Sequence, residues 1–374
     1  MDLQVAESLP PRPTSHNTPI GQANFPPMEN TRILQAARGE EVDKIPVWVM
    51  RQAGRYLPEF LKVKESYDFF TICTTPNVAC EVTLQPLRRF ALDAAIIFSD
   101  ILVVPQFMGM EVLMLPAKGP SFPQPLLSPE DAKRLIKPDP ETAFKPYLDS
   151  IYLTRHSLKG KVPLIGFTGG PFTLFTYMVE GGSSNTFTKS RKWIFAHPEE
   201  TKNILQMITD VVCEFLYAQV CSGAQIIQVF ESHAGLLGPA DFNEFILPYL
   251  NQIASFMKAK GRENPETDVP LILFAKDAGF MLEELFMTSY DAFGLDWTID
   301  ISKAKVLGQK YKKTIQGNFD PAMLYAPQDT IRARAFAMAQ VGGKSGYIAN
   351  LGHGIYPDTS PDHLQTFIEA VHTV

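Results

Sequence analysis

Two arginines follow an apolar run four residues apart, Arg51 and Arg55 in the segment Arg-Gln-Ala-Gly-Arg-Tyr. Each guanidinium presents a planar fork of donors that suits a carboxylate or a phosphate. Gly54, just before the second arginine, permits a tight turn and leaves room for a ligand to approach the backbone. The pair predicts a site for a small polyanion. The alternative is a surface turn whose arginines make ordinary ion pairs.

Polar residues also follow the other apolar runs of the chain. They are Ser99-Asp100, Thr168 with Tyr177 and Glu180, Glu231-Ser232-His233, Lys276-Asp277, Asp296-Trp297, Asn318 with Asp320, and His353. Because the carboxyl ends of barrel strands meet at one face, this recurrence predicts an active site there. His353 stands between two glycines, which favours a position facing a cavity.

Simpler structural roles remain open for several of these residues. Asp100 is also suited to be a helix N-cap, and Asp277 or Asp320 to cap a loop. Ser232 and His233 are equally compatible with a buried hydrogen-bonded pair.

The elements that would position these residues are short apolar runs that lack polar alternation, as in strands buried on both faces. They span 45–50, 94–99, 163–167, 225–230, 270–275, 292–296, 314–316 and 347–350. Segments with helical periodicity lie between them, at 199–221, 239–258, 303–311 and 329–341, and a first helix runs through Ile33 and ends at Gly39. This alternation predicts the α/β class and a single (β/α)8 TIM barrel over 29–374, with the active site at the C-terminal ends of its strands.

A doubly wound open sheet is the alternative fold, but no Gly-rich first turn announces it. Residues 119–127, rich in Pro and Ser, are interpreted as an extra loop near the barrel rim. Residues 1–28 are polar and Pro-rich and predict a flexible tail.

Composition narrows the class of protein. The chain has 374 residues, 45% of them hydrophobic, and a formal net charge of −6. A nucleic-acid-coating surface is therefore not expected, and an anion site must be a local basic pocket.

The four cysteines show no metal or disulfide spacing, and we interpret them as reduced thiols. No targeting segment is evident and no apolar run reaches the length of a membrane span, so a cytoplasmic protein is expected.

Sequence motifs for metal or nucleotide chemistry are missing. No HExxH, His-x-His or Asp-rich loop occurs, which disfavours a metal centre. The segment 342–345, Gly-Gly-Lys-Ser, mimics the end of a phosphate-binding loop. It lacks the first glycine, because position 338 is Met, and it precedes a strand instead of following one.

Several long segments resemble the uroporphyrinogen decarboxylase family: 46–56, 97–102, 166–173, 230–235, 294–297 and 350–354. The resemblance runs from about residue 29 to the C-terminus. It implies a cytoplasmic homodimer of (β/α)8 barrels in haem biosynthesis. The implied carboxy-lyase reaction converts the four acetate side chains of uroporphyrinogen III to methyls, giving coproporphyrinogen III and four CO2. The resemblance implies no cofactor, no metal, no nucleic acid and no membrane.

The resemblance also implies roles for individual residues. Substrate-binding positions are Arg51, Ala53, Arg55, Lys64, Asp100, Tyr177, Ser232 and His353, and the catalytic ones among them are Asp100, Arg51, His353 and Tyr177. Asp100 matches the carboxylate that receives the pyrrole N–H groups. Lys64 stands where many relatives carry Arg and cannot form the planar fork. His353 suits a proton donor better than Arg does, because imidazole titrates near neutrality.

Two other functions were weighed. A corrinoid-linked methyltransferase has a similar barrel but binds zinc through His and Cys near strand ends, and no cysteine follows Cys221 here. A tetrapyrrole-binding protein without catalysis would not require the retained Asp100, Tyr177 and His353.

Overall fold

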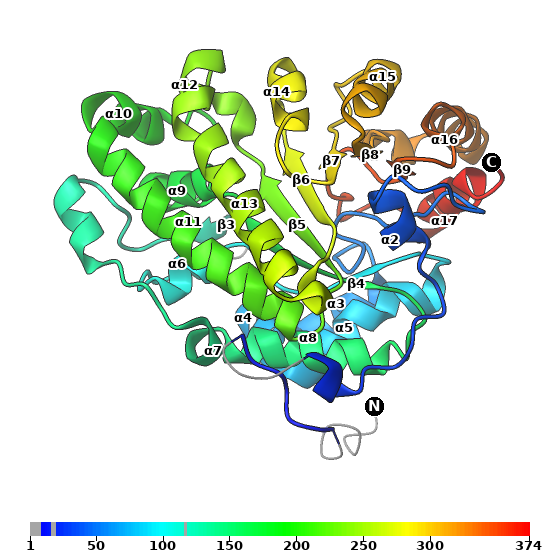
Figure 1. The fold of residues 1–374 in the computed structure, drawn as a ribbon, viewed down its shortest axis with the longest axis horizontal. Helices are drawn as coiled ribbons and strands as arrows, with labels where there is room; N and C mark the ends of the chain where they lie inside the picture. The colour runs from blue at the N-terminus through cyan, green and yellow to red at the C-terminus, as the bar shows by residue number, and fades with distance from the viewer. Residues whose placement is uncertain (1–8, 16–19, 116–117) are drawn as a thin grey trace.

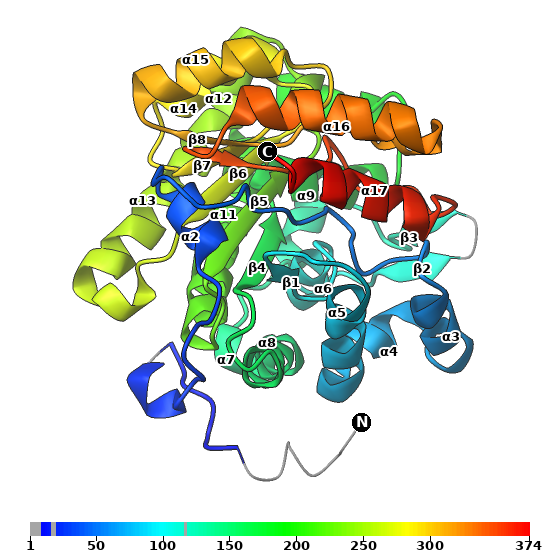
Figure 2. The ribbon, with the colours of Figure 1, turned by 90° about the vertical axis from the view of Figure 1, so that its right-hand side faces the viewer.

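The structure is a computed structural model that describes residues 9–15, 20–115 and 118–374. A parallel sheet of seven strands forms its centre, in the order β1-β4-β5-β6-β7-β8-β9. Figures 1 and 2 show that this sheet is curved and that most of the helices lie outside it. The α/β class is therefore confirmed.

The elements have the following bounds. The strands are β1 Ala95–Ile96, β2 Leu113–Leu115, β3 Gly119–Ser121, β4 Leu164–Gly169, β5 Ile226–Glu231, β6 Leu271–Ala275, β7 Ala292–Gly294, β8 Thr314–Gln316 and β9 Tyr347–Ile348. The α-helices are α2 Arg32–Ala37, α3 Pro58–Ser66, α4 Phe69–Thr74, α5 Pro76–Arg89, α6 Val103–Phe107, α7 Pro140–Ala143, α8 Lys145–Ser157, α9 Pro171–Glu180, α10 Thr188–Ala196, α11 Pro198–Cys221, α12 Pro239–Phe245, α13 Leu247–Glu263, α14 Leu282–Phe286, α15 Ile301–Tyr311, α16 Gln328–Gly342 and α17 Pro361–Val371. Short 3-10 helices are η1 Ile20–Ala23, η2 Pro129–Arg134, η3 Ala234–Leu236, η4 Pro265–Thr267, η5 Gly279–Met281 and η6 Pro321–Tyr325.

Seven of the eight apolar runs predicted as strands coincide with β1 and β4 to β9. Every residue of β5 and of β6 is buried. Such complete burial requires cover on both faces, which explains why these runs carry no polar alternation. The prediction of a parallel sheet is confirmed for these seven strands.

The first run, residues 45–50, is not a strand but pairs with the sheet at one point, where Val47 forms a parallel bridge with Ala349. Side chains take the place of the missing ladder bonds. The N–H of Val47 donates to the Asp93 carboxylate at 2.9 Å, and the N–H of Met50 donates to the Asn350 side chain at 3.0 Å. Because these side chains satisfy the backbone, the segment stays buried without regular pairing.

Alternating residues of the strands pack on opposite sides of the sheet. Leu271, Leu273 and Ala275 of β6 belong to the large cluster that includes the helices. Ile272 and Phe274 belong to a smaller cluster, away from most of the helices, that also contains Trp48. This two-residue period identifies the inner side of the curved sheet.

The helix predictions are largely confirmed, with one break and one correction. Predicted helix 239–258 is two helices, α12 and α13, because Pro248 in the first turn of α13 has no N–H with which to continue α12. The predicted loop 119–127 begins instead with β3, which pairs antiparallel with β2. That hairpin is short, so its pattern is too brief to be recognised in the sequence.

Helix α11 corrects the statement that no segment is long enough to span a membrane. Its 24 residues include a window with a mean hydropathy of 1.4, but 72% of that window is buried inside the protein. We interpret α11 as a core helix.

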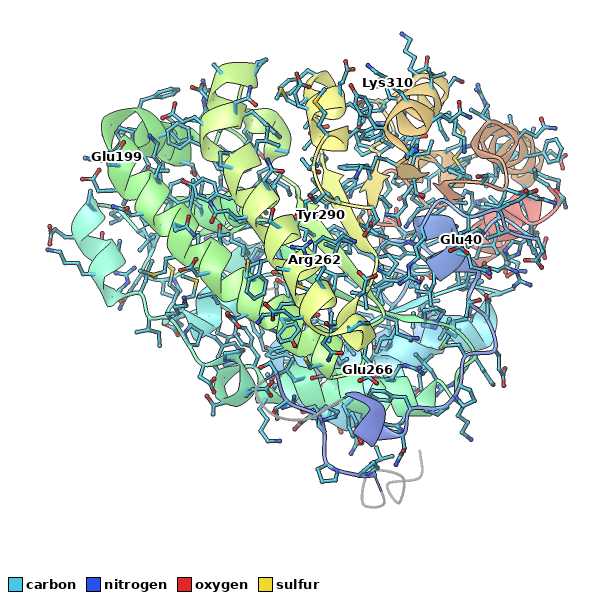
Figure 3. All side chains as sticks on the ribbon, viewed as in Figure 1. Glu40, Glu199, Arg262, Glu266, Tyr290 and Lys310 are labelled. Carbon is cyan, nitrogen blue, oxygen red and sulfur yellow. The ribbon has the colours of Figure 1, made fainter. Side chains whose placement is uncertain are left out.

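All four cysteines are free and buried, as expected for structural thiols. Tyr290, labelled in Figure 3, is another fully buried side chain.

The described part of the N-terminal tail lies against α7 and α8 (Figure 2). The Arg12 guanidinium donates to Asp149 at 2.9 Å and to Ser222 at 3.0 Å. It also lies 2.9 Å from Glu141, without hydrogen-bond geometry. Phe25 packs its ring against Tyr152 at 5.6 Å between centroids. Residues 1–8 and 16–19 of the predicted flexible tail lie outside the described residues.

Replacing Arg12 tests whether these contacts hold the tail in solution. Arg12→Ala leaves the Glu141 carboxylate, whose side chain is only 10% exposed, without its cation. We expect a loss of roughly 1–3 kcal/mol of stability, less than for a fully buried pair, measured as a lower Tm. Arg332→Ala is the control, because its pair with Glu369 is about half exposed on both sides. Equal Tm values for both variants would instead support a flexible tail.

Candidate active site

The turn that carries the two arginines is fixed by one buried side chain. Gln52 is fully buried, and its amide donates to Ala94 O at 3.0 Å while its oxygen accepts from Val49 N at 3.0 Å. The Tyr56 hydroxyl donates to Gln52 O at 2.8 Å. A Cβ on Gly54 would lie 2.8 Å from Arg51 O, so glycine is required here by the turn itself.

Arg51 is held in the left-handed region, with a φ of 65°. Its side chain lies along Gly354, where a Cβ would meet Arg51 Cδ at 2.4 Å. Arg51 is exposed and makes no ion pair or side-chain hydrogen bond with the residues that the structure describes. The alternative of an ordinary ion-paired surface turn is therefore wrong for Arg51 within that part of the chain.

Asp100 lies four residues beyond the end of β1. One carboxylate oxygen accepts from Leu102 N at 2.8 Å, just before α6 begins. The N-cap alternative is thus partly correct, although the bond closes a short turn ahead of the helix. Burial raises the pKa of Asp100, while the Leu102 N–H and the charge of Arg51 oppose that rise. Arg51 and Asp100 are therefore close enough to influence each other's charge.

Tyr177 and His233 form an aromatic wall on the α9 side of the site. Their rings lie 5.0 Å apart between centroids. Burial and Asp100 raise the pKa of Tyr177, and Arg51 lowers it, which places the phenol near both. His233 Nδ1 bonds Thr176 Oγ1 at 2.5 Å, so the predicted pair of Ser232 with His233 is replaced by one with Thr176. Ser232 itself is half-buried.

His353 is half-buried between aromatic rings. The centroids of Phe274 and Trp297 each lie 6.3 Å from its own. Burial and the charges of Arg51 and Lys276 together lower its pKa to about 4, against a rise from Asp277. His353 is therefore a neutral imidazole at pH 7. The expectation that it titrates near neutrality does not hold in this environment.

The remaining predicted residues belong to the arginine turn and to α3, which follows it. Ala53 is half-buried and packs against the large cluster. Arg55 and Lys64 are exposed, and neither has an ion pair within the described residues. The structure therefore brings together Arg51, Asp100, Tyr177 and His353, and leaves Arg55 and Lys64 as unpaired cations beside the turn.

Sequence reasoning did not assign a site role to two residues that the structure makes prominent. Lys276, at the end of β6, lowers the pKa of both His233 and His353 by its charge. Glu231 is fully buried and accepts from Phe172 N at 3.2 Å and Thr173 N at 2.6 Å, at the start of α9. A charged residue at the end of an otherwise apolar strand is the signal that identifies both.

Glu231 fixes the start of α9, the helix that carries Tyr177. The N-terminus of a helix has free N–H groups that favour a negative charge. A Cβ on Gly170 would lie 2.2 Å from Glu231 Oε2, so glycine leaves the space for the carboxyl group. Burial nevertheless raises the pKa of Glu231 to about 7, against the hydrogen bonds from Thr173 and Phe172.

The described residues contain no group of three or more His, Cys, Asp or Glu side chains arranged to hold a metal ion. What they do contain is cationic and polar side chains gathered beyond the carboxyl ends of parallel strands. This arrangement defines an α/β protein of the barrel-like class, with its site at the strand ends.

Comparison with known proteins identifies the family within this class. A family model for uroporphyrinogen decarboxylase matches residues 28–374. The chain is 53% identical to uroporphyrinogen decarboxylase of Danio rerio over 350 residues, which cover 93% of this chain and 95% of that protein. It is 51% identical to the human protein of that name over 354 residues, covering 94% and 96%. The chain therefore belongs to the uroporphyrinogen decarboxylase family.

A fungal relative and a solved structure complete the comparison. Uroporphyrinogen decarboxylase of Schizosaccharomyces pombe is 49% identical over 353 residues, covering 93% of this chain and 98% of that protein. A methyltransferase from Methanosarcina mazei superimposes with a TM-score of 0.76 at 21% identity, covering 92% of this chain and 98% of that one. At that identity the likeness shows a shared fold alone.

The raised pKa of Glu231 predicts a distinctive dependence of stability on pH. Since about 7 lies above the ordinary carboxyl value of 4.5, the protonated acid stabilises the fold at low pH, and this contribution is lost as the pH rises from 4.5 through 7. Glu231→Gln cannot ionise. We therefore expect its Tm, relative to that of the unaltered chain, to rise across this window.

The control for this prediction is Glu199→Gln. Glu199, labelled in Figure 3, lies in the first turn of α11, and its side chain is 77% exposed. Its Tm difference from the unaltered chain should stay nearly constant with pH. Every variant retains the same histidines, so the effect of their titration on Tm cancels in each Tm difference. A constant difference for Glu231→Gln as well would show that its carboxyl is ionised throughout the range.

Proposed function

We propose that this chain is a carboxy-lyase that decarboxylates the four acetate side chains of uroporphyrinogen III, giving coproporphyrinogen III and four CO2. The observation that carries the proposal is the unpaired state of Arg51 within the described residues, beside Asp100 and His353. A cation without a partner at the mouth of a site is ready to bind the carboxylates of a polyanion. Membership of the uroporphyrinogen decarboxylase family supports this choice of polyanion.

The chemistry requires an electron sink. Protonation of a pyrrole ring carbon beside the acetate gives an iminium-like cation, which accepts the electron pair of the breaking C–C bond as CO2 leaves. A proton then adds to the exocyclic carbon to complete the methyl, and the ring loses its extra proton. Each step thus exchanges CO2 for one proton overall. The pyrrole serves as its own sink, so the residues need only bind, orient and transfer protons.

Asp100 is suited to the developing cation. Its free carboxylate oxygen accepts hydrogen bonds from inward-pointing pyrrole N–H groups, and its charge stabilises the protonated ring. Because Leu102 N holds the other oxygen, the carboxylate is oriented before substrate binds. A puckered porphyrinogen offers more inward N–H donors than a flat oxidised porphyrin does, which favours the reduced ring system.

The other positions have assignments that follow from their location. Arg51, Arg55 and Lys64 bind carboxylates, Ala53 contributes a backbone contact, and Tyr177 and Ser232 orient the substrate. His353 is neutral before substrate arrives. Bound carboxylates bring negative charge that raises the imidazole pKa, so His353 takes up its proton together with the substrate.

Closure of the sheet and assembly belong to the same proposal. Residues 45–50 would complete an eight-stranded barrel between β9 and β1, supported by Ala349 N donating to Pro46 O at 2.9 Å and Asp93 N donating to Val47 O at 2.8 Å. On the family resemblance we also propose a cytoplasmic homodimer without cofactor, with uroporphyrinogen as its small-molecule partner.

The test is an anaerobic incubation of the purified chain with uroporphyrinogen III, with and without a metal chelator. Products are oxidised and separated by carboxylate number. Stepwise loss to the four-carboxylate product in both arms is the expected result. Loss of turnover with chelator would contradict a metal-free reaction. Tetrapyrrole binding without turnover would favour a carrier over an enzyme.

Asp100→Asn should lose most activity, by a factor of roughly 100 or more, while keeping its Tm within a few degrees. The amide retains the bond from Leu102 but carries no charge to stabilise the ring cation. Asp300→Asn is the matched control, since Asp300 caps α15 away from the site and Asn caps helices equally well. Near-normal turnover in Asp100→Asn would refute the role proposed for that carboxylate.

A further inference from the structure

Lys276 lies at the point where β6 meets the site. Ile272 and Phe274 face the inner side of the sheet, so the two-residue period directs position 276 to the same side. Strand-like pairing extends to this residue, because Lys276 N donates to Glu231 O at 3.1 Å and Lys276 O accepts from Gly235 N at 3.0 Å. The backbone of Lys276 is therefore as fixed as that of the strand before it.

The ammonium group of Lys276 is next to His353. Lys276 Nζ lies 5.7 Å from the Trp297 ring centroid, and that ring lies 6.3 Å from the His353 ring. Phe274, two residues before Lys276, contacts His353 at the same centroid distance. Two independent neighbours thus link Lys276 to a residue of the candidate active site.

The strand order places Lys276 across the mouth from Arg51. Counting round the sheet from residues 45–50, the order is β1, β4, β5 and then β6, followed by β7, β8 and β9 back to Ala349. Segment 45–50 and β6 are thus separated by three strands on either side. Arg51 leaves one of these positions and Lys276 the other, so the two cations approach the site from opposite walls.

A ring-shaped polyanion needs cations on more than one side. Uroporphyrinogen carries eight carboxylates distributed around its periphery. Arg51, Arg55 and Lys64 all follow the first segment, so all three enter the site from that one segment of the chain. A carboxylate on the opposite edge would otherwise enter a half-buried aromatic wall without a cation, at a large desolvation cost.

We propose that Lys276 binds a substrate carboxylate at the edge opposite to Arg51. This assignment rests on the proposed function; the sequence places Lys276 among the polar strand-end residues without giving it a role. Lys276 is ion-paired with the exposed Asp277. An ammonium has three donors, so it can keep its bond to Asp277 and also donate to a substrate carboxylate. Asp277 neutralises the lysine until the substrate arrives.

The test compares the steady-state kinetics of Lys276→Met, Lys276→Arg and the unaltered chain with uroporphyrinogen III. Methionine keeps an unbranched apolar stem against Trp297 but removes the charge. We expect KM to rise roughly tenfold or more, with a smaller change in kcat, and arginine to restore most of the loss. Lys303→Met, an exposed lysine on α15, is the control and should leave KM unchanged.

Each outcome distinguishes this inference from the proposed function. An active unaltered chain with unchanged KM in Lys276→Met would overturn the role of Lys276 and leave the decarboxylase assignment intact. No turnover by the unaltered chain would refute the function on which the inference rests. If Lys276→Met has a lowered Tm, Lys276→Gln replaces it, and a raised KM at an unaltered Tm is again the supporting result. A KM that arginine fails to restore in a stable variant would count against carboxylate binding.

Discussion

The structure depends on how one irregular segment satisfies its buried backbone. Residues 45–50 lie inside the protein but lack a full ladder, so side chains must supply partners for their polar groups. Asp93, Gln52 and Asn350 do so from three directions. Burial alone would raise the pKa of Asp93, but hydrogen bonds from His372, Asn30 and the backbone lower it overall, so it serves as a charged acceptor.

This arrangement determines where Arg51 points. The chain leaves the segment at a fixed place, turns with a positive φ at Arg51, and lays the side chain along Gly354. The glycine beside His353 therefore creates room for an arginine and not only for a ligand. Gly352 stands on the other side of the histidine. A Cβ at this position would lie 2.4 Å from Trp297 N, so glycine is what allows the two segments to pass so closely. Both glycines are explained by close approach within the protein.

Much of the fold could be predicted from the sequence because burial on both faces leaves a simple signature. β5 and β6 are buried throughout and mostly apolar, and the sequence predicts both as strands at nearly their observed bounds. The same signature predicts a full strand at residues 45–50, which are equally apolar but form a single bridge with the sheet and bond three of their N–H groups to side chains. An apolar run predicts that a segment is buried. It does not predict whether the backbone N–H groups bond to a neighbouring strand or to an Asp, Gln or Asn side chain.

The site could be predicted in part for a related reason. Residues with unusual chemistry after apolar strands were located correctly at the strand ends, including Asp100 and His353. Their protonation was not predictable, since it depends on burial and on charges brought together by the fold. The sequence places Lys276 among the polar strand-end residues but gives it no individual role, because a lone lysine after a strand has no motif. The structure adds its neighbours, since its charge lowers the pKa of both His233 and His353.

The positive charges of Arg51 and Lys276 help to explain the protonation state of His353. Arg51 and Lys276 both lower the pKa of His353, and burial lowers it more, so the imidazole is neutral at pH 7. A bound polycarboxylate would raise the pKa of the imidazole, because negative charge near an imidazole favours the protonated form. On the proposed function, the same cations would bind the substrate and keep the imidazole free of a proton until it arrives, so that substrate binding and proton uptake would be coupled.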